Sequence, residues 1–195
     1  MYKIAKRIGD VILSFIGIIL LSPFFLLIIL FIKIDSKGPI LFKQKRVGKN
    51  KKNFYILKFR TMKITTPKDM PTHLLENPES YITNAGKFLR KTSLDELPQV
   101  WNILIGDMSI VGPRPALWNQ YDLIEERDRY GANNVLPGLT GLAQVSGRDE
   151  LDIKEKAKID GKYVSEIGLK MDLLCFLMTL ISVIKKDGII EGKKS

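Results

Sequence analysis

The chain has 195 residues, 45% hydrophobic and 27% charged, and is long enough for one domain with a proper core. One cysteine, Cys175, excludes a disulfide framework, and one histidine, His73, makes a zinc hydrolase or a Ser-His-Asp triad a poor fit. Residues 1–60 hold 13 Lys or Arg against two Asp, which accounts for the formal net charge of +10. The basic excess therefore belongs to the N-terminal third.

That third contains an apolar run, Val11 to Ile32, without a charged residue and with basic residues at both ends. At about 1.5 Å per residue, such a helix can cross a bilayer core of about 30 Å, so a membrane protein is predicted. No cleavage site follows, so a removed signal peptide is not expected. Proline at Ser22-Pro23 predicts a kink or break in mid-run. A kinked single span is favoured, and a helix-break-helix hairpin is the alternative that explains basic residues at both ends.

C-terminal to the apolar run, the sequence pattern predicts one domain of mixed helices and strands. Residues 40–42 and 54–57 read as short strands around the basic turn 47–52. Lys58 lies at the end of the second strand, where a solvated basic strand end is the simpler interpretation. Helices are predicted at about 81–91, 95–105 and 116–130, with another beginning near 152. The uncharged run 173–184 is too short to span and suits a core or membrane-surface helix.

The segment Ser93-Leu94-Asp95-Glu96-Leu97-Pro98-Gln99 sets two carboxylates side by side, with Gly112-Pro113-Arg114-Pro115 downstream. Ser93 and Glu96 match a capping box, which would place Asp95 in a first helical turn whose field favours its ionised form by about 0.3–1 kcal/mol. Such a carboxylate can attack phosphorus or bind a metal, and Mg²⁺ would relieve the repulsion between the pair. Taken alone, the segment also fits an ordinary helix start.

A glycine-rich segment runs from Pro137 to Arg148 and contains Gly138, Gly141 and Gly147. Its composition lets backbone approach a ligand and places a guanidinium beside it. It lacks the P-loop lysine pattern, so nucleotide hydrolysis of that type is not supported.

Together these segments resemble one family over nearly the whole chain, the small bacterial sugar transferases that act as polyprenol-phosphate phosphoglycosyltransferases. The motifs that carry the resemblance are, in chain order, Lys6-Arg7-Ile8-Gly9-Asp10, Ser22-Pro23, Lys58-Phe59-Arg60-Thr61-Met62, Ser93 to Gln99, Gly106-Asp107-Met108-Ser109, Gly112-Pro113-Arg114-Pro115, Pro137-Gly138-Leu139-Thr140-Gly141 and Gly147-Arg148.

The resemblance implies transfer of a sugar 1-phosphate from a UDP-sugar to undecaprenyl phosphate, with release of UMP, as the first step of a surface polysaccharide such as capsule or O-antigen. It implies a covalent aspartyl-phosphosugar intermediate on Asp95, with Glu96 beside it, and Mg²⁺ held by both carboxylates. The basic residues it places at the substrate phosphates are Arg114, Arg148, Lys58 and Arg90.

The implied fold is α+β. A re-entrant membrane helix, residues 1–34, is broken at Ser22-Pro23 and packs on one compact cytoplasmic catalytic domain, residues 35–195, with short strands and several amphipathic helices. The implied location is the cytoplasmic face of the bacterial inner membrane. The expected partners are the UDP-sugar, undecaprenyl phosphate, inner-leaflet anionic lipids and downstream glycosyltransferases, with no nucleic acid.

Within the family, segments 64–67, 80–83 and 115–121 look most like members that use N-acetylated 6-deoxyhexosamines, which suggests a UDP donor with an N-acetylated amino or 6-deoxyamino sugar. Ile105 and Asp149 depart from residues common in relatives. Two other classes stay open: a lipid diphosphate hydrolase, and a membrane-anchored protein that binds lipid or nucleic acid without catalysis.

Overall fold

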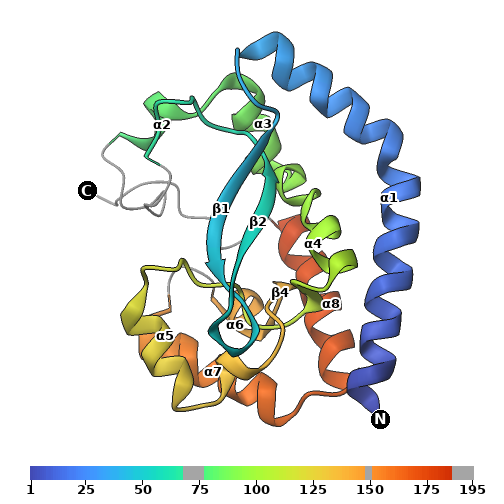
Figure 1. Ribbon diagram of the computed structural model, residues 1–195, viewed down its shortest axis with the longest axis vertical. Coiled ribbons are helices and arrows are strands. Elements are labelled where there is room, and N and C mark those ends of the chain that lie inside the picture. The colour runs from blue at the N-terminus through green and yellow to red at the C-terminus, as the bar shows by residue number, and fades with distance from the viewer. Residues whose placement is uncertain (68–76, 148–150, 186–195) are drawn as a thin grey trace.

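The computed structural model describes residues 1–67, 77–147 and 151–185, with the backbone alone for 183–185 (Figure 1). Its elements in chain order are α1 Tyr2–Asp35, β1 Leu41–Val47, η1 Lys49–Lys51, β2 Asn53–Phe59, α2 Pro78–Tyr81, α3 Asn84–Lys91, η3 Leu94–Glu96, α4 Gln99–Ile105, β3 Ser109–Val111, α5 Tyr121–Asp128, η4 Ala132–Asn134, β4 Gly138–Thr140, α6 Leu142–Ser146, α7 Ile153–Ser165 and α8 Leu169–Lys185. This mixture of helices and short strands agrees with the predicted α+β class.

The helix α1 runs without interruption through Pro23 and bends along its path (Figure 1). Of the kink or break predicted at Ser22-Pro23, the break into two separate helices is wrong, because α1 is one bent helix through Pro23. Proline cannot donate to the carbonyl of Ile19 four residues back, but the Ser22 hydroxyl donates to that carbonyl at 2.8 Å. The serine supplies the missing donor, so the helix continues.

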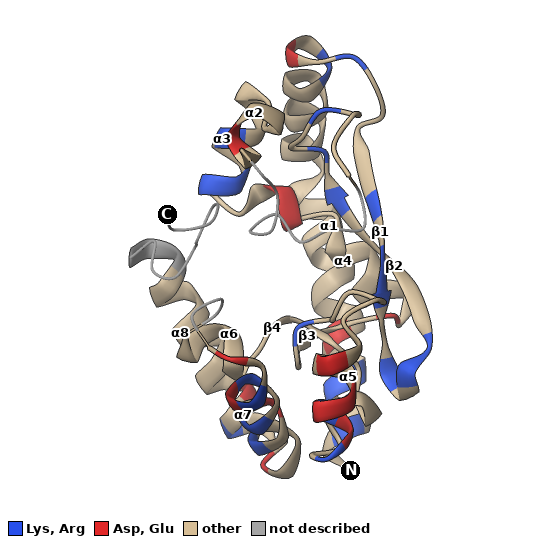
Figure 2. Ribbon diagram, turned by 90° about the vertical axis from the view of Figure 1, so that its left-hand side faces the viewer, with Lys and Arg blue, Asp and Glu red and all other residues tan. Residues whose placement is uncertain are grey.

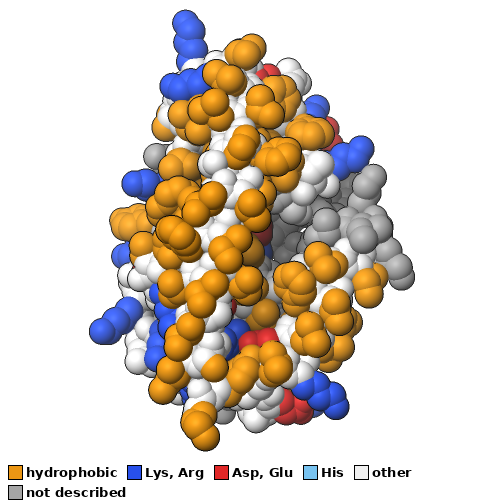
Figure 3. Space-filling view, turned by 90° about the vertical axis from the view of Figure 1, so that its right-hand side faces the viewer, with side chains coloured by type: hydrophobic (Ala, Val, Ile, Leu, Met, Phe, Trp, Pro, Cys, Tyr) orange, Lys and Arg blue, Asp and Glu red, His pale blue; other side chains and the backbone are white. Residues whose placement is uncertain are grey.

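Most of α1 is apolar and exposed, and its 34 residues, with a mean hydropathy of 3.0 over an 18-residue window, would allow it to cross a membrane. Large side chains such as Leu20, 68% exposed, and Leu26, 63% exposed, lie uncovered along it. Figure 3 shows hydrophobic side chains gathered along α1 and on α8. In α8, Asp172 and Cys175 are buried while Leu177 is exposed, as in a surface helix. This apolar face indicates association with a membrane.

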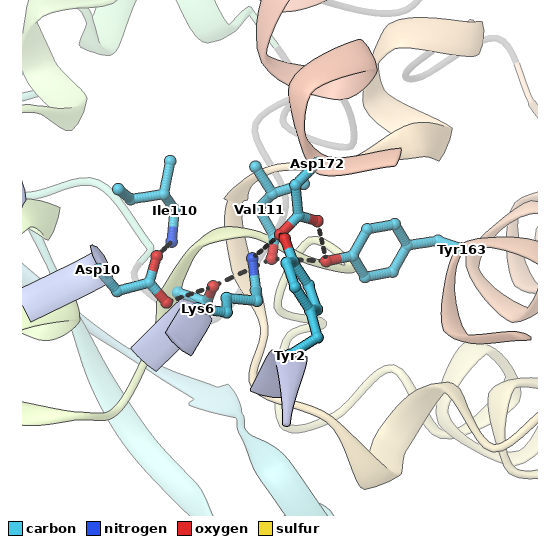
Figure 4. A network of polar contacts seen from close by, with 8 residues as sticks. Tyr2, Lys6, Asp10, Ile110, Val111, Tyr163 and Asp172 are labelled. Carbon is cyan, nitrogen blue, oxygen red and sulfur yellow. Dashed lines mark hydrogen bonds and ion pairs between the residues drawn. The ribbon is translucent and has the colours of Figure 1, made fainter. Parts of the chain in front are cut away.

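The N-terminal end of α1 is tied to the domain by buried polar contacts (Figure 4). The Asp172 carboxylate on α8 accepts hydrogen bonds from Tyr2 (2.6 Å), Lys6 (2.5 Å) and Tyr163 (2.7 Å). Asp10 accepts a hydroxyl (2.7 Å) and a backbone amide (3.2 Å) from β3. Because desolvated charges need such partners, these bonds hold the N-terminal end of α1 against α8 and β3.

The other end of α1 packs on a different part of the same domain. Ile28 and Ile32 form a buried cluster with Phe59 of β2 and Leu89 of α3. Asp35 accepts a backbone amide in the first turn of α3 at 3.0 Å. Both ends of α1 therefore contact one globular body.

The antiparallel strands β1 and β2 pair from Leu41 opposite Phe59 to Val47 opposite Asn53. The predicted hairpin is confirmed, and it is longer than the predicted strands. Lys and Arg residues lie along it and in its turn (Figure 2). The parallel pair β3 and β4, with Val111 opposite Thr140, was not predicted.

The glycine-rich segment serves this parallel pair. A Cβ atom on Gly138 would lie 2.1 Å from the backbone nitrogen of Gly112, and one on Gly141 would lie 2.1 Å from the Gly112 oxygen. The expectation that these glycines admit a ligand is therefore corrected, because they admit a neighbouring backbone.

The other predicted helices differ mainly in their limits. The predicted helix at 81–91 is not continuous, because α2 ends at Tyr81 and α3 begins at Asn84. Thr83 is the N-cap of α3, and its side chain accepts the Gly86 amide at 3.0 Å. The predicted helix at 116–130 shrinks to α5, because the Ala116 carbonyl accepts the Val47 amide at 2.9 Å instead. The helix expected near 152 is confirmed as α7, with Asp152 as its N-cap.

Candidate active site

Asp95 and Glu96 lie in the short helix η3, which is separated from α4 by Leu97 and Pro98. Ser93 precedes them in a left-handed conformation, with φ of 56°, and its side chain makes no capping bond. The predicted capping box is therefore wrong. The Glu96 side chain is engaged elsewhere, and the turn closes through the backbone, where the Glu96 amide donates to the Ser93 carbonyl at 3.2 Å.

Glu96 joins two cations from distant parts of the chain. Its Oε1 accepts Lys58 Nζ at 2.6 Å and Arg114 Nη2 at 3.1 Å. Burial acts to raise the pKa of Glu96, but the charges and hydrogen bonds of Lys58 and Arg114 outweigh it and hold the pKa well below its usual range. Glu96 is thus an anion that orients both cations.

Asp95 is half-buried beside this arrangement. Burial raises the pKa of the Asp95 carboxyl, and Glu96 acts in the same direction, while Lys58, Arg90 and Arg114 oppose the rise. The expectation that a helix end would favour its ionised form is corrected, because desolvation is the larger effect. A carboxylate of raised pKa is more basic, which makes it a stronger nucleophile than an exposed aspartate.

Four chain segments supply the site. Lys58 comes from the end of β2, Arg90 from α3, and Arg114 from the loop after β3, and all three act on the Asp95 carboxyl. Arg90 Nη1 also lies 3.9 Å from the Met62 sulfur. The structure therefore brings Asp95, Glu96, Lys58, Arg90 and Arg114 together. Arg148 lies outside the described residues.

The sequence interpretation missed Arg46, on β1. Its guanidinium donates to the Pro115 carbonyl at 3.0 Å and to Gln44 Oε1 at 2.5 Å. Its charge acts on Arg114 and Glu96. The available signal was two long polar residues, Gln44 and Arg46, at alternate positions on one strand face. With Arg46 the site holds four cations against two carboxylates, which favours an anionic ligand.

The donor chemistry of the dyad fits Mg²⁺. Carboxylate oxygens are its preferred protein ligands, and it is commonly held by one or two carboxylates together with substrate phosphates. Glu96 Oε1 is occupied by Lys58 and Arg114, so the second Glu96 oxygen and the Asp95 carboxylate would hold the ion. In the described part of the chain, no group of three or more His, Cys, Asp or Glu side chains offers a protein cage, so substrate phosphates would complete the shell.

Comparison with known proteins decides the family. The model of the family described as Bacterial sugar transferase matches residues 1–186. The chain belongs to this family. The predicted recognition and enzyme class are therefore confirmed.

Relatives match this bacterial sugar transferase along nearly its whole length. The exopolysaccharide production protein ExoY of Sinorhizobium fredii is 36% identical over 199 residues, which cover 95% of this chain and 88% of ExoY. The galactosyl transferase CpsE of Streptococcus agalactiae is 37% identical over 200 residues, covering 96% of this chain and 44% of CpsE. A Klebsiella pneumoniae protein named UDP-glucose:undecaprenyl-phosphate glucose-1-phosphate transferase is 38% identical over 188 residues, or 90% of this chain and 39% of that protein. The chain thus spans less than half of several larger relatives.

Proposed function

We propose that this protein transfers a sugar 1-phosphate from a UDP-sugar to undecaprenyl phosphate, releasing UMP and starting a surface polysaccharide. One observation carries the proposal: the two carboxylates of Asp95 and Glu96 lie beside the cations of Lys58, Arg90 and Arg114. The domain that holds them packs on the apolar helix α1. Two relatives named as UDP-glucose:undecaprenyl-phosphate glucose-1-phosphate transferases support the acceptor.

In the proposed first step, an Asp95 carboxylate oxygen attacks the β-phosphorus of the UDP-sugar. The bond from that phosphorus to the oxygen bridging the two phosphates breaks, and UMP leaves with the bonding electron pair. The sugar phosphate remains as an acyl phosphate ester on Asp95. Lys58, Arg90 and Arg114 would neutralise the oxygens that carry charge in this step, since phosphoryl transfer depends mainly on positioning and charge stabilisation.

In the second step, a phosphate oxygen of the lipid attacks the same phosphorus and the bond to Asp95 breaks. This yields the polyprenyl diphosphate sugar and restores the carboxylate. When held by Asp95 and Glu96, Mg²⁺ would supply further positive charge beside the donor diphosphate during the first step. The donor sugar is proposed as an N-acetylated amino or 6-deoxyamino sugar, although some relatives are named for glucose or galactosyl transfer.

The experiment measures UMP release from a panel of UDP-sugars, with and without undecaprenyl phosphate. The panel includes UDP-glucose, UDP-galactose and N-acetylated 6-deoxyhexosamine donors. We expect UMP release that depends on the lipid, with sugar phosphate in the lipid phase. Steady release without lipid would favour a hydrolase, and no release from any donor would favour a non-catalytic binding protein.

We further propose that α1 is re-entrant and that the domain lies on the cytoplasmic face, within reach of inner-leaflet anionic lipids and of downstream glycosyltransferases. The contacts of both helix ends with one domain support this, because a helix that crossed the bilayer would carry one end away from it.

The topology predicts how added cysteines react. In Lys3→Cys and Lys52→Cys, both at exposed positions, a membrane-impermeant maleimide should label neither protein in intact cells and both after lysis. The native Cys175 is fully buried and gives no background. Labelling at position 3 before lysis would show that α1 spans the membrane.

A further inference from the structure

The loop that carries Arg114 is held at four consecutive backbone carbonyls, those of residues 113–116. Each accepts one hydrogen bond of 2.9 or 3.0 Å, and the donors are, in chain order, Gly138 N, Arg127 Nη1, Arg46 Nη1 and Val47 N. Fixing the backbone on both sides of Arg114 limits where its guanidinium can reach.

Two of these four donors are arginine side chains, and the loop sequence explains why. Pro113 and Pro115 have no N–H group and a fixed φ, so this segment cannot form a regular strand ladder. Buried carbonyls still require donors. Side chains from β1 and α5 supply them, and bonds from charged donors are stronger than neutral ones.

The two arginines differ in how their charge is balanced. Arg127 forms a buried ion pair with Asp160 at 2.6 Å, and the two side chains are 4% and 1% exposed. Its positive charge is therefore compensated locally. Its contribution to the loop is the hydrogen bond to the Arg114 carbonyl.

Arg46 has no contacting carboxylate within the described residues, and its two hydrogen bonds go to neutral oxygens. Its Nε atom is buried and has no hydrogen-bond partner in that part of the chain. Burial, followed by the charge of Arg114, lowers the pKa of Arg46 to about 9, while Glu96 acts in the opposite direction. Arg114 and Glu96, whose charges act on Arg46, both belong to the candidate site.

We propose that Arg46 is a positioning residue, which fixes the Arg114 loop through the Pro115 carbonyl and adds an uncompensated positive charge to the site that binds the donor diphosphate. The backbone supports this role, because β1 also bridges Leu117 at Arg46 and bonds Ala116 at Val47. This inference rests on the proposed function.

A double-mutant cycle tests whether Arg46 acts through Arg114. Arg46→Met is compared with wild type, and again in the Arg114→Gln background, for transfer rate and for affinity for UDP. We expect about a ten-fold or larger loss of kcat/KM in the wild-type background and less than about a two-fold loss in the Arg114→Gln background, because residues that act as a unit are not additive. Equal losses in both backgrounds would overturn the proposal.

Two further variants separate positioning from folding. Arg129→Met removes an exposed arginine paired with Glu126, and should leave transfer unchanged. Arg46→Lys keeps the charge but not the planar fork, and should restore UDP affinity more fully than turnover. If Arg46→Met lowers the melting temperature sharply, Arg46→Lys replaces it in the cycle. Wild-type protein without transfer activity would refute the proposed function, whereas the UDP-affinity cycle would still decide the role of Arg46.

Discussion

Asp95→Asn is expected to abolish sugar phosphate transfer while the protein stays folded. The amide keeps the shape of the side chain but removes the attacking oxygen, and loss of a covalent nucleophile lowers turnover by about a thousand-fold or more. The Asp95 side chain makes no hydrogen bond within the described residues, so the melting temperature should change little. Lipid product formed from a radiolabelled donor measures the loss.

The matched control for this variant is Glu125→Gln, the same carboxyl-to-amide change at an exposed position on α5. It should retain wild-type transfer. An Asp95→Asn protein with wild-type activity would remove Asp95 from the chemistry and leave Glu96 as the remaining candidate of the dyad.

Glu96→Gln is expected to give the next largest effect. Lys58 and Arg114 both donate to Glu96 Oε1, so the neutral amide leaves two cations without the anion that orients them. Misplaced stabilising groups cost on the order of a hundred-fold in kcat. The rate of UMP release under saturating donor and lipid measures this loss.

Glu126→Gln is the control, because Glu126 also pairs with an arginine, Arg129, at 2.9 Å on the surface of α5. Its transfer rate should match wild type, since an i, i+3 pair whose arginine is 62% exposed contributes little. If Glu96→Gln and Glu126→Gln behaved alike, Glu96 would have no special part in arranging the cations.

The predictable parts of the fold are those that a short stretch of sequence specifies by its residue pattern. The β1–β2 hairpin follows from two short β-rich runs around a turn, and Asp152 marks the start of α7 by its capping chemistry. The gathering of Lys58, Arg90 and Arg114 at the dyad followed from the family resemblance rather than from any spacing in the chain. Ordered motifs therefore predicted the site better than local chemistry did.

The missed features depend on contacts between distant segments. The strands β3 and β4 have three residues each, too few for a periodic signal, and they pair only because Gly138 and Gly141 allow close approach. The helix α1 continues through Pro23 because one serine hydroxyl replaces the lost donor. The predicted capping box of Ser93 and Glu96 does not form, because the Glu96 side chain instead accepts hydrogen bonds from Lys58 and Arg114.

Arg46 shows the same limit within the site. In sequence it is one basic residue of a basic hairpin, and such residues usually face solvent. Its role depends on a loop 69 positions away, whose Pro115 carbonyl it binds. The alternation of Gln44 and Arg46 along β1 marks one strand face, but it does not indicate which distant loop that face contacts.

Mass spectrometry of the intact protein, incubated with UDP-sugars and Mg²⁺ without lipid acceptor, tests the covalent mechanism most directly. We predict a mass increase equal to one sugar 1-phosphate less one water, located on Asp95 by peptide mapping, lost on addition of undecaprenyl phosphate and absent from Asp95→Asn. Lipid-dependent transfer by a protein that never carries this adduct, or an adduct that persists in Asp95→Asn, would contradict it.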